Sequence, residues 1–139
     1  MHDYASLYAQ SVDDVESFWL DAAQHIAWDT PPETSLDRSE PPFYRWFPDG
    51  RLNTCFNAVD RHVLAGRGDQ DAIIYDSPIT NKISKITFAE LQQKTAQFAG
   101  MLSGFGVATG DRVIIYMPMI PEAIVAMLGC ARLGAVHSV

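Results

Sequence analysis

The end of the sequence constrains the fold most, because it predicts a strand, a helix and a second strand in direct succession. Asp111–Met117 is a short apolar run with several β-branched residues, which favours a strand buried on both faces. Pro121 stands where the first residue of a helix belongs, and residues 122–133 are apolar almost all round. Gly134 is placed to end that helix, and Ala135–Val139 predicts the second strand. This order is typical of the parallel crossover unit of an α/β protein.

The sequence stops inside the second predicted strand. A parallel crossover is stable only when its strands pair within a sheet and its helix packs on that sheet. We therefore expect these 139 residues to be the first part of a larger α/β protein whose chemistry lies beyond Val139. We also expect helix 122–133 to leave an apolar patch and strand 135–139 to leave an unpaired edge, so that the chain self-associates as a dimer or higher oligomer.

The composition predicts a globular chain with an acidic surface. Its hydrophobic content of 47% is enough for a core, and its formal net charge is −7. This acidity, with three lysines at Lys82, Lys85 and Lys94, argues against nucleic acid and membranes as partners. No apolar stretch approaches the length of a bilayer span, and Met1–Gln10 lacks the apolar run of a signal peptide. We expect a cytoplasmic protein.

The first part of the chain predicts a helix followed by an extended segment. Ser11 can cap a helix whose apolar side chains recur at helical spacing from Val12 to Ile26, a pattern typical of a core face. Residues 31–50 are rich in proline and aromatic side chains, and disordered segments are depleted in aromatic residues. We interpret them as a strap that lies across a larger body with its rings in grooves, and we expect a turn at residues 48–50.

The middle of the chain predicts a short helix, a β-hairpin and a longer helix. The short helix covers residues 53–64, with Phe56, Val59 and Val63 on one face. Ala72–Tyr75 and residues 82–86 predict the two strands of the hairpin. Thr87 and Glu90 fit a capping box, in which each side chain bonds the backbone amide of the other residue. The apolar stripe of the longer helix and the glycines that end it are Phe88, Leu91, Thr95, Phe98, Leu102, Gly104 and Gly106.

No residue receives a catalytic, cofactor-binding or metal-binding role from its pattern. Cys55 and Cys130 fall on predicted helices and are interpreted as buried free thiols. Asp60-Arg61-His62 suggests acid–base chemistry, but successive helical residues point in different directions, which favours a surface salt bridge beside a hydrogen-bonded histidine. The histidines show no ligand spacing with one another or with the cysteines: His2, His25, His62 and His137.

Three glycine-containing stretches invite a phosphate-binding interpretation. Gly66-Arg67-Gly68 has no helix directly after it, so the amide cradle of a helix N-terminus is missing. Gly104-Phe105-Gly106 leads into a strand, the reverse of a dinucleotide-binding turn. Gly129 and Gly134 are better explained by close packing and by capping. The pattern of residues alone therefore predicts an α/β fragment of unassigned function.

A longer string of residues resembles a known family. YMPMIPEAIVAMLGCARLGAVHSV at residues 116–139 is similar to the short-chain acyl-CoA synthetases, the acetyl- and propionyl-CoA synthetase branch of the adenylate-forming superfamily. Residues 86–91 (ITFAEL) resemble an early element of that superfamily. The resemblance extends upstream through Phe18-Trp19, Trp28, Arg45-Trp46-Phe47, Asp49-Gly50, Leu52-Asn53, Asn57 and Asp60-Arg61-His62. It therefore covers the chain from about Tyr4 to Val139.

The resemblance implies two domains and an enzymatic parent protein. Residues 1–65 would be the N-terminal helical and strap module of the family, and residues 66–139 the incomplete start of the AMP-binding domain. The parent protein would be an ATP-dependent ligase that forms an acyl-adenylate and then an acyl-CoA, with ATP, Mg2+ and CoA as cofactors and a short-chain carboxylate as substrate. No residue here matches a catalytic or ligand-binding position of the family, so we expect these 139 residues alone to be inactive and to bind none of these cofactors.

Two questions stay open at the level of sequence. Residues 36–50 (LDRSEPPFYRWFPDG) resemble propionyl-CoA synthetases more than acetyl-CoA synthetases, which favours propionate over acetate as the substrate. The residues of the acyl pocket, which would decide between the two acids, lie outside the chain. A different class of function is a free-standing, non-catalytic interaction module, and the unfinished strand at Val139 argues against it.

Overall fold

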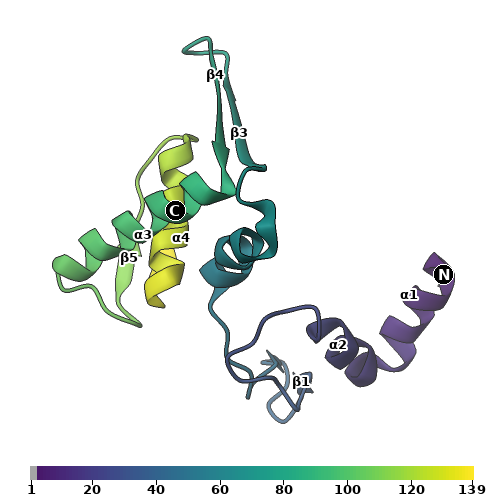
Figure 1. The fold of residues 1–139 in the computed structure, drawn as a ribbon. Coiled ribbons are helices and arrows are strands. Elements are labelled where there is room, and N and C mark those ends of the chain that lie inside the picture. The colour runs from purple at the N-terminus through teal and green to yellow at the C-terminus, as the bar shows by residue number, and fades with distance from the viewer. Residues whose placement is uncertain (1–2) are drawn as a thin grey trace. The chain divides into compact units, whose positions relative to one another are not determined.

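The computed structural model describes residues 3–139, and these form two compact units. The first unit ends at Leu52 and the second begins at Asn53 (Figure 1). The first unit contains two helices and a small pair of strands, and the second contains a β-hairpin and a strand–helix–strand crossover. Within residues 3–139, each helix is too short or too polar to cross a bilayer.

The N-terminal helix is broken into two. Helix α1 covers Tyr4–Asp13 and helix α2 covers Val15–Ala23. Asp14 separates them, because its backbone amide donates to the Gln10 carbonyl while its side chain accepts from the amide of Ser17. The prediction that Ser11 caps one continuous helix is therefore wrong. Ser11 lies inside α1, where its hydroxyl donates to the Tyr8 carbonyl at 2.8 Å. The residue that ends α1 is Asp14, whose side chain can bond the local backbone.

The apolar face of these helices is less buried than its pattern predicts. Ala23 is buried, whereas Val12 is 56% exposed and Trp19 is 39% exposed within the structure. Trp19 packs edge-on against Phe18 and against Trp46, with ring centroids 5.2 and 5.6 Å apart. The helical stripe thus forms local aromatic contacts, and the prediction of a core face is wrong for α1.

The strap is extended and carries a short antiparallel pair of strands. Strand β1 (Leu36–Asp37) pairs with β2 (Arg45–Trp46). The indole of Trp28 donates to the Ala23 carbonyl at 2.8 Å and packs against Phe47. The predicted turn at 48–50 is confirmed, since the amide of Gly50 donates to the Phe47 carbonyl at 3.0 Å. That the rings of the strap lie in grooves of a larger body stays a prediction.

The second unit begins with a helical segment of unusual winding. Asn53 accepts from the amide of Phe56 at 3.0 Å, and two π-helical turns follow at η1 (Phe56–Asp60) and η2 (Val63–Arg67). Gly66 lies inside η2 and, with a φ of 77°, kinks it one residue before its end at Arg67. The predicted helix is therefore present, but the wider π turns change its buried face: Cys55 and Val59 are fully buried, whereas Phe56 is 37% exposed.

The predicted hairpin and the helix after it are confirmed. Strand β3 (Asp71–Ser77) pairs antiparallel with β4 (Lys82–Thr87) across a turn that contains Asn81 at a φ of 52°. Helix α3 (Phe88–Gly104) starts at the expected capping box, in which the Glu90 amide donates to Thr87 Oγ1 and the Thr87 amide donates to Glu90 Oε2. Gly106, with a φ of 88°, follows the end of this helix.

The crossover at the end of the chain is also confirmed. Strand β5 (Arg112–Ile114), helix α4 (Pro121–Leu133) and strand β6 (Val136–Ser138) follow one another, and β5 pairs parallel with β6. Gly134 ends α4 in the left-handed conformation. Strand β5 is shorter than predicted, and burial on both faces is wrong for the described residues, because Ile115 is buried while Ile114 is 83% exposed.

The core of the second unit consists of two clusters on either side of Phe98. One joins η1, the hairpin, α3 and α4 around Cys55, Val59, Leu91 and Val125. The other joins β5, α4 and the start of β6 around Ile115, Ala126, Cys130 and Ala135. The expected apolar patch on helix 122–133 is therefore wrong, because this helix packs against α3 and the sheet. Several exposed apolar side chains instead lie in or next to β5 and β6, at Ile114, Tyr116, Met117, Met119, Val136 and Val139.

Candidate functional site

A buried carboxylate joins three elements of the second unit. Asp60, at the end of η1, is 8% exposed and accepts two hydrogen bonds from Arg132 Nη2, at 2.7 Å to Oδ2 and 2.9 Å to Oδ1. Gln92 of α3 donates to Oδ1 of the same carboxylate at 2.7 Å. Asp60 thus connects η1 to α3 and α4 through charge-assisted hydrogen bonds, which are stronger than neutral ones.

Arg132 is held at both its side chain and its backbone. The side-chain amide of Asn53 donates to the Arg132 carbonyl at 3.0 Å, near the C-terminal end of α4. Although burial opposes its charge, the hydrogen bond to Asp60 raises the pKa of Arg132 above its usual range. Arg132 is therefore positively charged at all ordinary pH values. Because the carboxylate already accepts from Arg132, Gln92 and the thiol of Cys55, Asp60 is placed to hold the elements together and not to act as a general base.

The three residues of the Asp60-Arg61-His62 sequence point to different partners, as predicted. Arg61 donates to Asn57 Oδ1 at 3.0 Å, and His62 Nδ1 is hydrogen-bonded to the guanidinium of Arg67. Burial, together with the charges of Arg67 and Arg61, lowers the pKa of His62. The interpretation of Asp60 as part of a surface salt bridge is wrong, because it is buried and its partner, Arg132, is 72 residues away.

Both cysteines are buried free thiols, as predicted. Cys55 and Cys130 have no exposed surface and form no disulfide. Burial raises the pKa of each thiol, so that both are protonated and unreactive at neutral pH. Among residues 3–139, moreover, the His, Cys, Asp and Glu side chains form no cluster of three that could hold a metal ion.

The glycines serve the backbone and packing, as the sequence indicates. A Cβ atom added at Gly129 of α4 would lie 2.6 Å from Cδ1 of Phe98, so glycine permits the close approach of α3 and α4. Gly66 kinks η2 and Gly106 follows the end of α3, both with a positive φ, and β3 and β5 are the next elements after them. In the described chain, these glycine stretches do not precede a helix N-terminus, which is the usual cradle for a phosphate.

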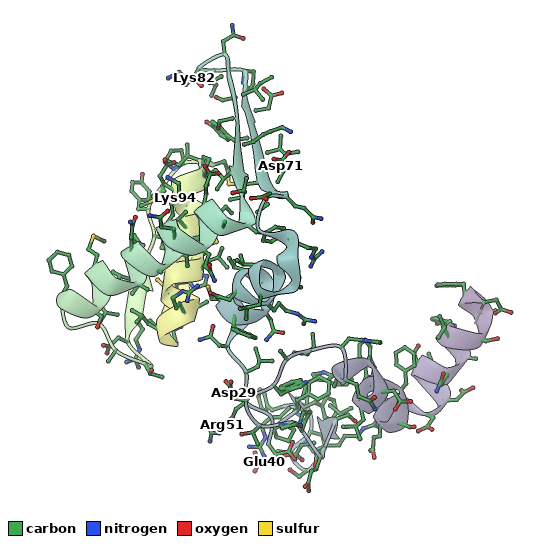
Figure 2. The ribbon with its side chains drawn as sticks, viewed as in Figure 1. Asp29, Glu40, Arg51, Asp71, Lys82 and Lys94 are labelled. Carbon is green, nitrogen blue, oxygen red and sulfur yellow. The ribbon has the colours of Figure 1, made fainter. Side chains whose placement is uncertain are left out.

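Charged side chains outside the Asp60 cluster are spread over the second unit. Figure 2 shows Lys82 at the tip of the β3–β4 hairpin, Asp71 at its base and Lys94 on α3. Asp71 is paired with Lys85, and 60% of the Lys85 side chain is exposed. Exposed ion pairs of this kind contribute little to stability. These residues do not converge on a common point where a substrate could bind.

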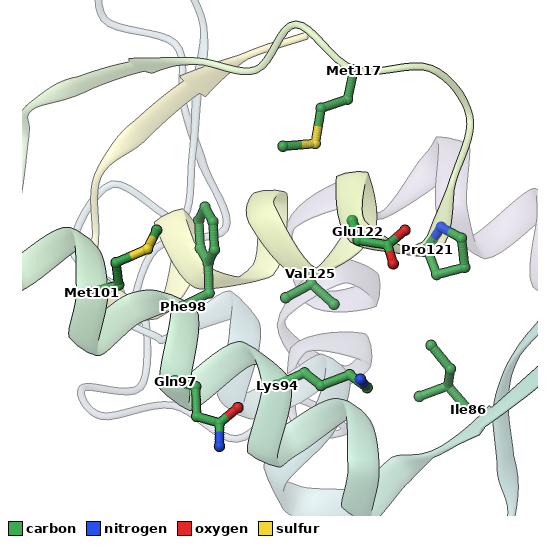
Figure 3. Close-up of a pocket in the computed structure, with 9 residues that line it drawn as sticks. All are labelled: Ile86, Lys94, Gln97, Phe98, Met101, Met117, Pro121, Glu122 and Val125. Atoms are coloured by element: carbon green, nitrogen blue, oxygen red, sulfur yellow. The ribbon is translucent and has the colours of Figure 1, made fainter.

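A groove of about 450 Å3 lies between α3, α4 and the loop that follows β5. Figure 3 shows Met117 reaching from that loop toward the ring of Phe98, with Lys94 and Glu122 at the margins. We call this hollow the α3–α4 groove, and its lining residues are Ile86, Lys94, Gln97, Phe98, Met101, Met117, Pro121, Glu122 and Val125. Apolar side chains dominate the lining, and these described residues do not combine a nucleophile, a base and an orienting group.

Two family models match consecutive parts of the chain. Residues 4–58 match the model described as acetyl-coenzyme A synthetase N-terminus. Residues 60–139 match the model described as AMP-binding enzyme. The second match alone covers more than half of the chain.

Individual proteins are similar over the same length. Acyl-CoA synthetase short-chain family member 3, mitochondrial, of Bos taurus is 49% identical over 136 residues, or 98% of this chain and 20% of that protein. Acetyl-coenzyme A synthetase of Thiobacillus denitrificans is 49% identical over 140 residues, covering 100% of this chain and 21% of that protein. The chain thus spans about a fifth of the length of the curated relatives it matches.

A solved structure has the same arrangement of elements. Acetoacetyl-CoA synthetase from Streptomyces lividans matches with a TM-score of 0.85 and 34% identity, over 99% of this chain and 21% of that one. This similarity confirms the predicted fold class, a helical and extended segment followed by a hairpin, a helix and a crossover. The resemblance inferred from the sequence is confirmed as well.

Proposed function

The chain belongs to the AMP-binding enzyme family, and from this premise we propose that the whole protein is a short-chain acyl-CoA synthetase. Such a ligase joins a carboxylate to ATP with release of pyrophosphate, and then transfers the acyl group from AMP to the thiol of CoA. The observation that carries the proposal is the 49% identity to acyl-CoA and acetyl-CoA synthetases over essentially all of these residues.

We propose that residues 1–139 are a structural part of this enzyme and are inactive alone. The reaction requires ATP, Mg2+ and CoA, and the described residues do not fit these groups. They form neither a cluster of metal ligands nor a glycine-rich turn before a helix. The phosphate, metal and CoA contacts would therefore come from the part of the protein outside this chain, which the length of the relatives leaves room for.

Propionate is the substrate that we propose, with acetate as the alternative. The resemblance of residues 36–50 to propionyl-CoA synthetases supports propionate. Acetate is supported by the 49% identity to the acetyl-coenzyme A synthetase of Thiobacillus denitrificans, which equals the identity to the Bos taurus short-chain acyl-CoA synthetase. Comparing kcat/KM for the two acids in the whole enzyme decides between them, because this ratio measures differential binding of the two transition states.

The contrasting proposal is a free-standing interaction module that has the family fold without its chemistry. The two proposals differ in pyrophosphate exchange, since an adenylate-forming enzyme returns labelled pyrophosphate to ATP in the presence of its acid. We expect exchange with the whole protein and none with residues 1–139. Exchange by residues 1–139 alone would contradict their structural role, and no exchange by the folded whole protein with either acid would favour the module.

Two further properties are proposals at this stage. We propose a cytoplasmic protein. The Bos taurus relative is named as mitochondrial, so the alternative location is the mitochondrion, and cell fractionation distinguishes the two. We also propose a domain boundary near residue 65, where Gly66 kinks η2 with a positive φ. Limited proteolysis of the whole protein would place this boundary, and cleavage confined to residues near 52 would move it to the limit between the two compact units.

A further inference from the structure

The helical segment that opens the second unit winds more widely than its sequence predicts. In η1, the amide of Arg61 donates to the carbonyl of Phe56, five residues back, whereas an α-helix bonds residues four apart. The apolar residues of the segment are nevertheless spaced for an α-helix, with Phe56, Val59 and Val63 on one face. The structure departs from this local pattern, so an interaction outside the segment must favour the wider winding.

The wider turn places Cys55 and Asp60 on the same buried face. Cys55 is fully buried and Asp60 is 8% exposed, and the Cys55 thiol donates to Asp60 Oδ2 at 4.0 Å. In an α-helix, residues five positions apart point about 140° away from each other, so the two side chains would not share a face. The π winding therefore makes this contact possible, and it leaves Phe56 37% exposed.

An α-helical winding of the same residues would bury a different set of side chains. At about 3.6 residues per turn, positions 56, 59, 60 and 63 lie within about 100° of one another, and Cys55 lies about 90° from the centre of that face. Phe56 would then replace Cys55 in the space beside Leu91 and Val125. Because the phenylalanine ring is much larger than a thiol and protein cores are close-packed, the segment would have to move away from α3 and α4.

That displacement is incompatible with the hydrogen bonds of Asp60. Its carboxylate accepts from Arg132 of α4 at 2.7 and 2.9 Å and from Gln92 of α3 at 2.7 Å. Distances this short require the backbone of η1 to lie close to both helices, which the small Cys55 side chain permits. The two windings therefore differ in whether the buried carboxylate can reach its partners.

We propose that the Asp60–Arg132 pair acts as a conformational selector for η1. It favours the π winding with Cys55 inward over an α-helical winding with Phe56 inward. Specifying one register is the best-attested role of a buried polar or ionic group, whose net contribution to stability is often small. The inference goes beyond the proposed activity and does not depend on it.

Thiol alkylation of the whole protein tests this selection, with Cys130 as an internal control. Cys55 and Cys130 are both fully buried, but Cys130 lies on α4, which is α-helical. The variant combines Asp60→Leu with Arg132→Met, so that neither charge is left without its partner. Burial raises the pKa of the Cys55 thiol, while the charge of Arg132 lowers it and that of Asp60 raises it, so removing both charges together has opposing effects on its reactivity.

The two cysteines should respond differently in this variant. We expect alkylation of Cys55, measured by mass spectrometry of its peptide in the folded protein, to be at least about 10-fold faster than without the substitutions. Alkylation of Cys130 should stay the same. Continued protection of Cys55 in the folded variant, or an equal rise at both cysteines, would overturn the proposal.

Deletion of a single residue tests the winding while keeping the pair. Ala58 of η1 and Ala96 of α3 are both exposed alanines inside helical segments. Without Ala58, Cys55 and Asp60 are four positions apart and share a face of an ordinary α-helix. Without Ala96, the rest of α3 turns by about 100°, which moves the buried Ala99 out of the core.

The two deletions should therefore differ in cost. We expect deletion of Ala58 to lower the Tm of the whole protein by less than half as much as deletion of Ala96, with Cys55 still protected from alkylation. Equal losses of Tm, or exposure of Cys55 when Ala58 is deleted, would contradict the proposal.

Discussion

Replacing Arg132 with methionine should destabilise the second unit, because it leaves the Asp60 carboxylate buried without its cation. The variant removes the contacts at 2.7 and 2.9 Å and keeps the one from Gln92. Breaking a fully buried ion pair costs about 3–5 kcal/mol. The Arg132 side chain is 27% exposed and that of Asp60 is 11% exposed, so solvent screening reduces this energetic cost. We expect a loss of about 2–3 kcal/mol in the free energy of unfolding.

Urea unfolding followed by circular dichroism measures this loss in residues 1–139. A change of this size lowers the urea midpoint by about 1–2 M in a small protein. Arg112→Met is the matched control, because Arg112 is an exposed arginine of β5 in the same unit, and its replacement should change the midpoint little. A midpoint for Arg132→Met equal to that of the Arg112→Met control would refute the role assigned to the pair.

A double-mutant cycle separates the pair from other effects of Arg132. Asp60→Asn keeps the size of the side chain and removes its charge. In the double variant it therefore removes the buried negative charge that Arg132→Met alone leaves without a cation. We expect the double variant to be more stable than the sum of the single changes predicts, by about 1–2 kcal/mol. Additive losses would mean that Arg132 contributes through packing alone.

Three further outcomes follow from single residues. Gly129→Ala should destabilise by about 1–3 kcal/mol, because its Cβ would meet the Phe98 ring at 2.6 Å, whereas Gly100→Ala in α3 meets nothing within 4 Å and should stabilise by up to about 1 kcal/mol. Urea midpoints of the two variants should therefore move in opposite directions, and a shared direction would contradict the packing described. Cys55 and Cys130 should react with a thiol reagent in urea and not in buffer, since both are buried and burial raises the pKa of each thiol. Rapid reaction of native protein would show that these helices open. The lowered pKa of His62 means that the unfolded chain binds its proton more readily, so the contribution of His62 is present above about pH 6.5 and is lost as the pH falls through its folded pKa. His62→Gln should flatten the pH dependence of stability in this range, and an unchanged profile would assign it to other groups.

Local signals in the sequence correctly identified the regular elements of the second unit. Thr87 and Glu90 lie three residues apart and form the capping box that starts α3. Pro121 and Gly134 mark the two ends of α4, because proline suits a first helical position and glycine accepts the left-handed conformation. These features depend on neighbouring residues, so a short stretch of sequence contains the information that specifies them.

The features that sequence reasoning missed depend on distant residues or on competing local bonds. Asp60 and Arg132 are 72 positions apart, and neither shows its partner in its own neighbourhood. A single arginine in the apolar helix 122–133 was the available signal, since a charge in a buried helix requires a counter-charge. The break between α1 and α2 lies at Asp14, whose backbone amide bonds the end of α1 and whose side chain caps α2.

The most direct test of the proposed function is the set of products formed by the whole protein. Purified protein would be incubated with propionate, ATP, Mg2+ and CoA, and the nucleotides and thioesters separated by chromatography. A short-chain acyl-CoA synthetase produces AMP and propionyl-CoA in equal amounts, and omission of propionate or CoA abolishes the thioester. The appearance of ADP in place of AMP, or the absence of any thioester with propionate and with acetate, would contradict the assignment.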